Sequence, residues 1–529
     1  MELPEAILQR VARVLSFHQS TALSADTAIA PADVTRPSPI RFFEGYAKIP
    51  LPTSLISAST PALSLLRQGL EVVPDSQLQP PQDLRTLATW LFLGGGNVRP
   101  DMPEEAARVC PSDGGVFPCE IYVAAFAVAG LEPGFYHFNA REFALYQLRN
   151  GQETLAQIKR GRPDLEFVKI PPAALLVSTI FCRSTWAFGP RGYRHALTDA
   201  GRLMQNLSTA GNGLGMQTQV RLAVNAQDMR QLIGLAPDAQ FPDAEAVQGT
   251  VIWADAAEKP IGPATEGDAP SPMPTIPRAP LAEIVAAYDE IIAVHGDCVA
   301  PEATVREVGP PLTELTPLPP DFPVQDLPQP QESDSDDPGP AVDRLLLTVT
   351  PARYFAQNFI PRDRLWQMTR AAFRGGTSYP LFPSGPYAAL VRPFWMIQGV
   401  SGMDEGVWFY DPMKDAWSAL RLGPVRAESR NLTCSDPRFA SAAAVCFIVS
   451  NLQRLMTEGG PDLYRLAHLE AGAAAQRLYL AAGALRLACC ATGAFFDEDM
   501  RRFFGLDRTP WQPLHVLALG PPADEFAPV

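Results

Sequence analysis

Apolar residues recur at helical spacing in several segments of this chain, and the clearest of these patterns occur twice. Residues 4–18 and 281–295 both carry apolar side chains every three to four positions, which predicts an amphipathic helix in each. A longer helix is predicted at about 194–214, and residues 464–478 repeat its pattern of polar and apolar positions. The remaining helical patterns are shorter and cover residues 60–68, 84–93, 226–234 and 497–506.

Short apolar runs bounded by glycine and proline predict β-strands between these helices. The turn Glu132-Pro133-Gly134 joins two such runs, and a third run follows closely, which is typical of an antiparallel meander. The density of proline in residues 36–52 excludes a helix there and favours an extended arm. The predicted strands are residues 120–128, 135–138, 143–148, 173–181 and 248–253 in the first half, and 442–450 and 515–519 in the second.

The same helical motif is present twice, about half the chain length apart. Both Tyr193-Arg194 and Tyr464-Arg465 are followed, five residues after the arginine, by an acid and then by Ala-Gly. One repeat of this length indicates two copies of one domain, because a solenoid would repeat at a much shorter period. We therefore expect a first domain at 1–257, a linker at 258–280, and a second domain at 281–529 that contains a proline-rich, acidic loop at 308–340.

Composition and charge narrow the class of protein. The 529 residues carry a formal net charge of −14, which argues against nucleic acid as a main partner, because a phosphate backbone attracts basic surfaces. The sequence has no run of eighteen apolar residues and no signal-peptide pattern at its start, so we expect a cytoplasmic protein without a membrane span. The eight cysteines show no metal-ligand spacing, and no metal site is predicted. Cys489-Cys490 lie in an apolar run with helical character, which predicts buried thiols.

The stretch at 108–118 combines an arginine, two prolines and a polar turn directly before a predicted strand. It reads Arg-Val-Cys-Pro-Ser-Asp-Gly-Gly-Val-Phe-Pro. Gly114 and Gly115 would let the backbone approach a flat ligand closely, because they lack a Cβ. A simple turn before a strand explains Ser112 and Asp113 equally well on spacing alone, so both interpretations stay open at this point.

Three motifs together resemble those of the SagB-type dehydrogenases, a group of nitroreductase-fold flavoproteins that includes the thiazoline and oxazoline peptide dehydrogenases. Residues 108–118 are similar to the family's Arg-x-x-Pro-Ser-x-Gly-x-x-Tyr-Pro, and residues 134–138, Gly-Phe-Tyr-His-Phe, to its Gly-Leu-Tyr-x-Tyr. Residues 192–207 resemble its long central helix. The resemblance covers most of residues 4–255, and in the second half mainly residues 400–412 and 464–507.

This resemblance implies an α+β fold with two tandem nitroreductase-like domains, each an antiparallel-rich sheet flanked by helices, that form a pseudo-dimer within one chain. It also implies FMN as the cofactor, with Arg353 suited to the phosphate group. Residues 383–387 of the second copy carry an extra proline in the flavin loop, which removes a backbone donor, so one complete site per chain is expected. The residues expected to bind FMN are Arg108, Pro111, Ser112, Asp113, Gly114 and Gly115 from the first copy, and Arg353, Phe355 and Gln357 from the second.

The azole-forming members of that family carry a Lys-Tyr pair before the long helix, where a base takes a proton while hydride leaves to flavin. This chain has Ala187-Phe188 at the equivalent position, and Glu458-Gly459 in the second copy. Tyr193 and Arg191 are the nearest candidate catalytic residues, although arginine stays protonated and is a poor base.

Four other repeated residues have structural interpretations. Asp199 and Glu470 lie near the start of the predicted long helices, where an acid is favoured by the helix dipole. His18 and His295 end the predicted amphipathic helices, which favours a cation or cap role over catalysis. Packing of the long helix also explains the repeated Tyr-Arg pair.

These features lead us to expect an FMN-dependent oxidoreductase that transfers hydride from a peptide or peptide-derived biosynthetic intermediate to flavin. Partner proteins from the same biosynthetic cluster are expected with that function, and the pseudo-dimer would allow one chain to act as a monomer. Two alternatives stay open. One is an NAD(P)H-dependent reductase of small nitro or quinone compounds, and the other is a scaffold or peptide-binding partner without flavin.

Overall fold

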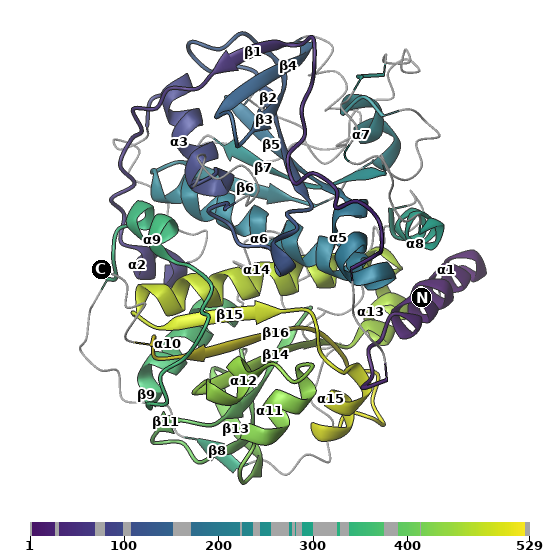
Figure 1. Cartoon of the computed structure of the whole chain (residues 1–529), viewed down its shortest axis with the longest axis vertical. Helices are drawn as coiled ribbons and strands as arrows, with labels where there is room; N and C mark the ends of the chain where they lie inside the picture. The colour runs from purple at the N-terminus through teal and green to yellow at the C-terminus, as the bar shows by residue number, and fades with distance from the viewer. Residues whose placement is uncertain are drawn as a thin grey trace. The chain divides into compact units, whose positions relative to one another are not determined.

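The computed structural model divides into two compact units, each with its own sheet (Figure 1). Unit 1 contains Met1–Ala28, Pro61–Glu71 and Glu302–Val529, and unit 2 contains Ile29–Thr60 and Val72–Pro301. Among the helices that the structure describes, none combines the length and apolar character needed to cross a bilayer. The structure describes residues 3–26, 31–68, 80–98, 107–151, 171–222, 225–235, 244–254, 275–277, 281, 288–299, 325–327, 338–374, 390–412 and 414–523.

Unit 2 is built on an antiparallel sheet with the strand order β1-β4-β3-β2-β5-β7-β6. Every residue of β2 and β5 is buried, because packed side chains cover both faces of the sheet. On one face, Tyr122 and Leu176 join a cluster with Met229 and Leu232 of helix α7. The five strands predicted in this half are confirmed, whereas β6 and β1, which lies in the predicted extended arm, are not predicted as strands. The strands are β1 (Ala47–Pro50), β2 (Cys119–Ala125), β3 (Gly134–Asn139), β4 (Ala144–Asn150), β5 (Ala173–Ile180), β6 (Gln217–Arg221) and β7 (Glu245–Ala254).

The predicted long helix is confirmed as α6 (Gly192–Gly213), which packs on the other face of this sheet (Figure 1). Helix α3 (Leu84–Gly95) lies against α6, and the Trp90 indole donates a hydrogen bond to the carbonyl of Leu207 at 2.8 Å. A Cβ on Gly94 would come within 2.3 Å of the Leu207 side chain, so the glycine permits close helix packing. The other helices of unit 2 are α5 (Phe181–Phe188), α7 (Ala226–Leu232) and α8 (Asp289–Val299), with short 3-10 turns η2 (Asp113–Gly115) and η3 (Gly189–Arg191).

Unit 1 repeats the same sheet topology. Its strand order, β8-β13-β12-β10-β14-β16-β15, matches that of unit 2 strand for strand, which is the fold expected from a tandem duplication. Residues 488–492 form edge strand β15, so the helical interpretation of Cys489-Cys490 is wrong, although both thiols are buried as predicted. The strands are β8 (Gln325–Leu327), β10 (Arg392–Ile397), β12 (Gly406–Asp411), β13 (Ala416–Leu422), β14 (Ala444–Ser450), β15 (Ala488–Thr492) and β16 (Gln512–Gly520), with β9 (Ile360–Pro361) and β11 (Val400–Ser401) forming a separate pair.

Helix α14 (Asp462–Ala484) is the counterpart of α6 and the predicted second long helix. Aromatic side chains on the opposite face of the sheet form the core of unit 1, with Phe394, Phe447 and Phe504 in mutual contact. The remaining helices of unit 1 are α1 (Glu5–Ser20), α2 (Ala62–Gln68), α9 (Val342–Thr348), α10 (Arg362–Phe373), α11 (Arg426–Leu432), α12 (Pro437–Ser441), α13 (Leu452–Gly459) and α15 (Asp497–Phe503).

The two halves of the sequence exchange their first helices. Helix α1 belongs to unit 1, where His18 Nδ1 lies 3.2 Å from the hydroxyl of Tyr464 on α14. Helix α8 belongs to unit 2, where His295 Nδ1 lies 3.1 Å from the hydroxyl of Tyr193 on α6. The repeated histidines therefore bond to the repeated tyrosines of the opposite half, and the predicted helix-cap role is wrong. The domain limits 1–257 and 281–529 describe the sequence repeat, whereas the compact units share segments of both halves.

Loss of either tyrosine hydroxyl should destabilise its own unit. We expect Tyr464→Phe and Tyr193→Phe each to lower the free energy of unfolding by about 1–3 kcal/mol, because a buried histidine nitrogen loses its partner. Urea unfolding of the full chain, followed by fluorescence and by hydrogen exchange of each unit, would measure this. Tyr354→Phe is the control, since Tyr354 is 67% exposed and should change the value by less than about 0.5 kcal/mol.

Candidate functional site

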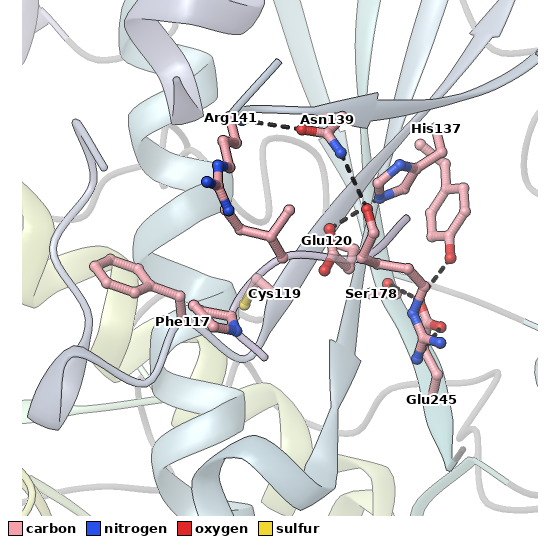
Figure 2. A network of polar contacts seen from close by, with 12 residues as sticks. Phe117, Cys119, Glu120, His137, Asn139, Arg141, Ser178 and Glu245 are labelled. Carbon is pink, nitrogen blue, oxygen red and sulfur yellow. Dashed lines mark hydrogen bonds and ion pairs between the residues drawn. The ribbon is translucent and has the colours of Figure 1, made fainter. Parts of the chain in front are cut away.

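A buried carboxylate in unit 2 anchors the strand that follows the glycine loop. Glu120 on β2 contacts Arg183 Nη2 at 2.6 Å through one oxygen. Its other oxygen lies 2.9 Å from His137 Nε2 (Figure 2). Burial alone would raise the pKa of Glu120, but the Arg183 guanidinium and the His137 hydrogen bond hold that pKa well below its ordinary value. The carboxylate is therefore charged, paired and fixed.

Two arginines, the buried Arg183 and the half-buried Arg108, extend this network to the main chain on either side. Arg183 donates to the carbonyls of Ser38 at 2.7 Å and Phe117 at 3.1 Å. Arg108 donates to the carbonyls of Pro39 at 2.7 Å and of Cys119, the residue before Glu120, at 3.1 Å. Burial lowers the pKa of Arg108, with Glu120 acting in the opposite direction. Arg108, which is predicted to bind the cofactor, uses these two hydrogen bonds to hold Pro39 of the arm beside Cys119.

A second buried carboxylate continues the network across the sheet to β7. Glu245 accepts hydrogen bonds from the Ser178 hydroxyl at 2.6 Å and the Tyr122 hydroxyl at 2.9 Å (Figure 2). Its other oxygen lies 3.8 Å from Arg41 Nη2. The amide of Asn139 donates to the carbonyl of Arg41 at 3.2 Å, so the arm is also tied to β3. The strands and the arm around the loop are therefore held by charge-assisted contacts as well as by apolar packing.

The loop itself is fastened to helix α6 by Asp199. The Ser112 hydroxyl lies 2.6 Å from one carboxylate oxygen of Asp199, and the backbone N–H of Asp113 donates to the other at 3.3 Å. The Ser112 hydroxyl also accepts from the N–H of Phe117 at 3.0 Å. Asp199 is the eighth residue of α6 and binds the loop, so the predicted helix-dipole role is wrong. Ser112 consequently faces the helix, and the part of the loop that faces outward is its glycines.

Asp113 turns inward and completes a polar cluster under the loop. Its carboxylate lies 3.1 Å from His195 Nδ1 and 3.2 Å from Arg202 Nη1, and all three side chains are buried. Burial, and then repulsion from Asp113, raises the pKa of Asp199 to about 8, while Arg202 acts in the opposite direction. With this pKa, Asp199 is mostly protonated near neutral pH.

Gly114 and Gly115 form the outward tip of the loop in a conformation that suits glycine. Their φ angles are +62° and +63°, in the left-handed region that residues with a Cβ disfavour. A Cβ on Gly114 would meet the ring of Phe188 at 2.8 Å, whereas a Cβ on Gly115 would find no atom of the described residues within 4 Å. The open space over Gly115 lets a flat ring lie directly on the backbone, so the loop fits a flavin at this point.

The remaining residues predicted for the first copy lie close to this loop but are already engaged. Tyr193 is fully buried and bonds to His295, so its hydroxyl is not presented to a ligand. Arg191 is buried in η3 directly before α6. The Phe188 ring stacks on His195 with ring centres 3.9 Å apart and planes inclined by 5°. Pro111 is half-buried beside Ser112.

The residues predicted for the second copy lie in unit 1. Arg353 and Gln357 are exposed, whereas Phe355 is only 6% exposed and packs in the core against Gly520. The loop at 383–387 lies outside the described residues. Unit 1 also contains a cavity of about 480 Å³. This volume is within the usual range for small-ligand pockets, roughly 300–1,000 Å³. Its lining includes Thr348, Val349, Thr350, Arg344 and Arg486, so it offers cations as well as apolar surface.

Sequence reasoning missed the partners of the loop on α6. His195, Asp199 and Arg202 follow the spacing i, i+4, i+7, which places them on one face of the helix. Such a polar stripe on a helix that is buried all round is a signal that could have been found. Within the described ranges, no group of three or more His, Cys, Asp or Glu side chains is arranged to hold a metal ion.

The chain resembles nitroreductases in sequence and in structure. A family model described as the nitroreductase family matches residues 104–247 and 352–521, more than half of the chain. A Methanocaldococcus jannaschii protein named as a nitroreductase is 28% identical over 157 residues, which cover 29% of this chain and 75% of that protein. A crystal structure described as a nitroreductase from Anabaena variabilis superposes with a TM-score of 0.71 at 20% identity and covers 97% of this chain and 99% of its own. This structural likeness concerns the fold.

A weaker likeness is found to one chain of the E. coli microcin synthetase McbBCD complex, solved with truncated pro-MccB17 bound. That chain is 18% identical, and the match covers 47% of this chain and 93% of the other. The TM-score of 0.30 is too low to support an argument about function.

The raised pKa of Asp199 predicts that the free energy of unfolding falls as the pH rises. The folded pKa, about 8, lies above the ordinary value of 3.8, so the stabilising contribution is complete below about pH 4 and is lost as pH rises to 8. Asp199→Asn cannot titrate and can keep both loop hydrogen bonds. We expect its free energy of unfolding, relative to the natural protein, to rise between pH 5 and pH 8 by up to about 1.4 kcal/mol per pH unit.

Urea unfolding at each pH would measure this difference. Glu132→Gln is the control, because Glu132 is an exposed acid in the same unit and its replacement should give a profile parallel to that of the natural protein. Parallel profiles for Asp199→Asn as well would contradict the assignment of the proton.

Proposed function

Because this chain belongs to the nitroreductase family of oxidoreductases, we propose that it binds FMN and transfers hydride from a peptide or peptide-derived biosynthetic intermediate to the flavin. The family membership supports an oxidoreductase, and the FMN and the peptide substrate are the proposed part. The motif at 108–118 supports this finer reading, because it resembles that of the SagB-type dehydrogenases.

The observation that carries the proposal is the glycine tip of the loop. Gly114 and Gly115 present bare backbone in a left-handed conformation, with open space over Gly115, while Asp113 and Ser112 tie the loop to α6 from below. A rigid backbone edge of this kind can approach a flat ring more closely than any side chain would allow. A loop that served only as a turn would not need Ser112 and Asp113 to bind buried side chains of α6.

In this proposal the flavin supplies the two-electron acceptor, and the protein supplies binding, orientation and the exclusion of water. Gly114 and Gly115 would contact the ring system, and Phe188 would limit the space on the side of Gly114. The buried pair Asp113 and Asp199 holds the loop in one position, so the ring would bind to a preformed surface. Arg353 stays the predicted phosphate ligand. Partner proteins of a biosynthetic cluster belong to the same proposal.

A reductase of nitro or quinone compounds is the second candidate, and one observation favours it. Ala187 and Phe188 occupy the positions of the family's Lys-Tyr base, and neither can take a proton. Hydride transfer from NAD(P)H to flavin needs no such base. The two candidates therefore differ in whether the protein must remove a proton from its substrate.

Purified protein should carry flavin and show absorption near about 450 nm, with one FMN per chain. We expect Gly115→Leu to lose most of this flavin, because the side chain would fill the open space over the loop. Gly45→Leu is the matched control: Gly45 also has a left-handed φ, +81°, and open space around its Cβ position, but lies in the arm just before β1. Both variants carry the same backbone cost of about 1–2 kcal/mol, so only the loss of flavin distinguishes them.

Flavin retained by Gly115→Leu at full stoichiometry would contradict the proposed contact. Well-folded natural protein without flavin would instead favour the scaffold reading. Anaerobic mixing of the holoprotein with NADPH separates the two enzyme candidates, since rapid bleaching of the flavin favours the reductase. Arg353→Ala tests the phosphate prediction independently, through the FMN dissociation constant.

A further inference from the structure

One nitrogen of a buried histidine beside the glycine loop has no hydrogen-bond partner in the described part of the chain. His195 on α6 is 2% exposed, and its Nε2 is the atom concerned. A buried polar atom without a partner is costly, so such atoms are usually completed by a ligand or by water. We propose that His195 Nε2 is the proton acceptor of the reaction and replaces the absent Lys-Tyr pair. This inference rests on the flavin-dependent function proposed above.

The partner on the other ring nitrogen fixes which nitrogen is available. Asp113 lies 3.1 Å from His195 Nδ1 and also pairs with Arg202. The Arg202 guanidinium favours the ionised form of Asp113, and an ionised carboxylate only accepts hydrogen bonds, so Nδ1 carries the hydrogen. The lone pair of the neutral imidazole is therefore on Nε2. A histidine oriented by a carboxylate in this way is the usual arrangement of a general base.

Burial keeps the imidazole neutral at pH 7. Burial is the main cause that lowers the pKa of His195, Asp113 raises it, and Arg191 and Arg194 lower it. Arg202 and Asp199 act from the far side of Asp113, where both contact the same loop. A neutral histidine can accept a proton, whereas a histidinium could only donate one.

Phe188 connects the histidine to the glycine loop. Its ring stacks on the imidazole at 3.9 Å, and the tip of the same ring is the atom that a Cβ on Gly114 would strike at 2.8 Å. A single aromatic ring thus spans from the proposed flavin contact to the proposed base. Phe188 stands where the family has the tyrosine of its base pair. The position where the family's base is missing, Phe188, is therefore in direct contact with His195.

The proposed step balances as a two-electron oxidation. A carbon–hydrogen bond of the substrate breaks, and its hydride leaves to the oxidised flavin. A proton leaves the neighbouring atom and forms a new N–H bond at His195 Nε2, and a double bond forms between the two substrate atoms. The substrate is oxidised and the flavin is reduced. The imidazolium then returns its proton to solvent, and Asp113 stabilises the charge in the interval.

Chemical modification tests the accessibility of Nε2 without any substrate. Diethyl pyrocarbonate acylates unprotonated imidazole nitrogen, and peptide mass spectrometry locates the product. We expect His195 to react several-fold faster in Phe188→Ala than in the natural protein, and saturating FMN to suppress that reaction. His468 is the internal control, because it is a fully buried histidine on α14 in unit 1 and should stay unmodified in every sample.

Kinetics of His195→Gln test the role in proton transfer. The probes are a synthetic peptide with a thiazoline ring, whose oxidation requires proton removal, and NADPH with menadione, whose reaction does not. We expect kcat for the thiazoline peptide to fall by about 10²–10⁴-fold and the acidic limb of the kcat/KM profile to disappear. The NADPH reaction, normalised to flavin content, is the comparison, and we expect it to fall far less than the thiazoline reaction. Asp113→Asn should move the same limb, since it alters the hydrogen bond at Nδ1.

The outcomes separate the two proposals. Natural protein that binds no flavin would overturn the proposed function and this inference together. A flavin-containing protein in which His195 stays unreactive in Phe188→Ala would overturn the inference alone, and so would an unchanged rate and pH profile in His195→Gln. If the natural protein does not oxidise the thiazoline peptide, the modification result decides by itself.

Discussion

The charge on Glu120 is the constraint around which unit 2 is arranged. A carboxylate in the interior is tolerated when it is paired and hydrogen-bonded, and Arg183 and His137 provide both. Arg183 cannot serve Glu120 without also reaching the carbonyls of Ser38 and Phe117, which fixes the extended arm and the end of the glycine loop. Removing either partner would leave a buried charge uncompensated, and for that reason the scaffold beneath the loop has little freedom to move.

The helices and strands that could be predicted from the sequence are those marked by a pattern of apolar residues within the element itself. The helices α1 and α6 and the strands β2 to β5 follow from periodicity, because a buried face imposes a fixed spacing on apolar residues. Strand β15 escaped because Ala488–Thr492 is a short edge strand of small residues that continues the apolar run of α14. The repeated sequence pattern also predicted the tandem fold, because two copies of one sequence pattern adopt the same topology.

The glycine loop of the candidate site could be predicted from its sequence motif, whereas the residues that anchor it could not. The glycine loop has a recognisable order of residue types, and Ser112, Asp113, Gly114 and Gly115 do lie together at one place. Their anchors are about 80 to 90 residues away in the chain, as the Ser112–Asp199 contact shows, and no local pattern assigns such pairs. Asp199 illustrates the difficulty: its position near a helix start suggested an electrostatic role that its actual partners exclude.

The exchange of first helices has a consequence for the order in which this protein can be completed during synthesis. His295 follows its partner Tyr193 by 102 residues, whereas Tyr464 follows its partner His18 by 446. At a translation rate of roughly 5–20 residues per second, helix α1 must wait roughly 20–90 seconds for the helix that it packs against. Unit 2 can therefore close while the ribosome is still producing unit 1. The amphipathic face of α1 has to stay shielded throughout that interval, so this helix is synthesised before α14 but packs only after it.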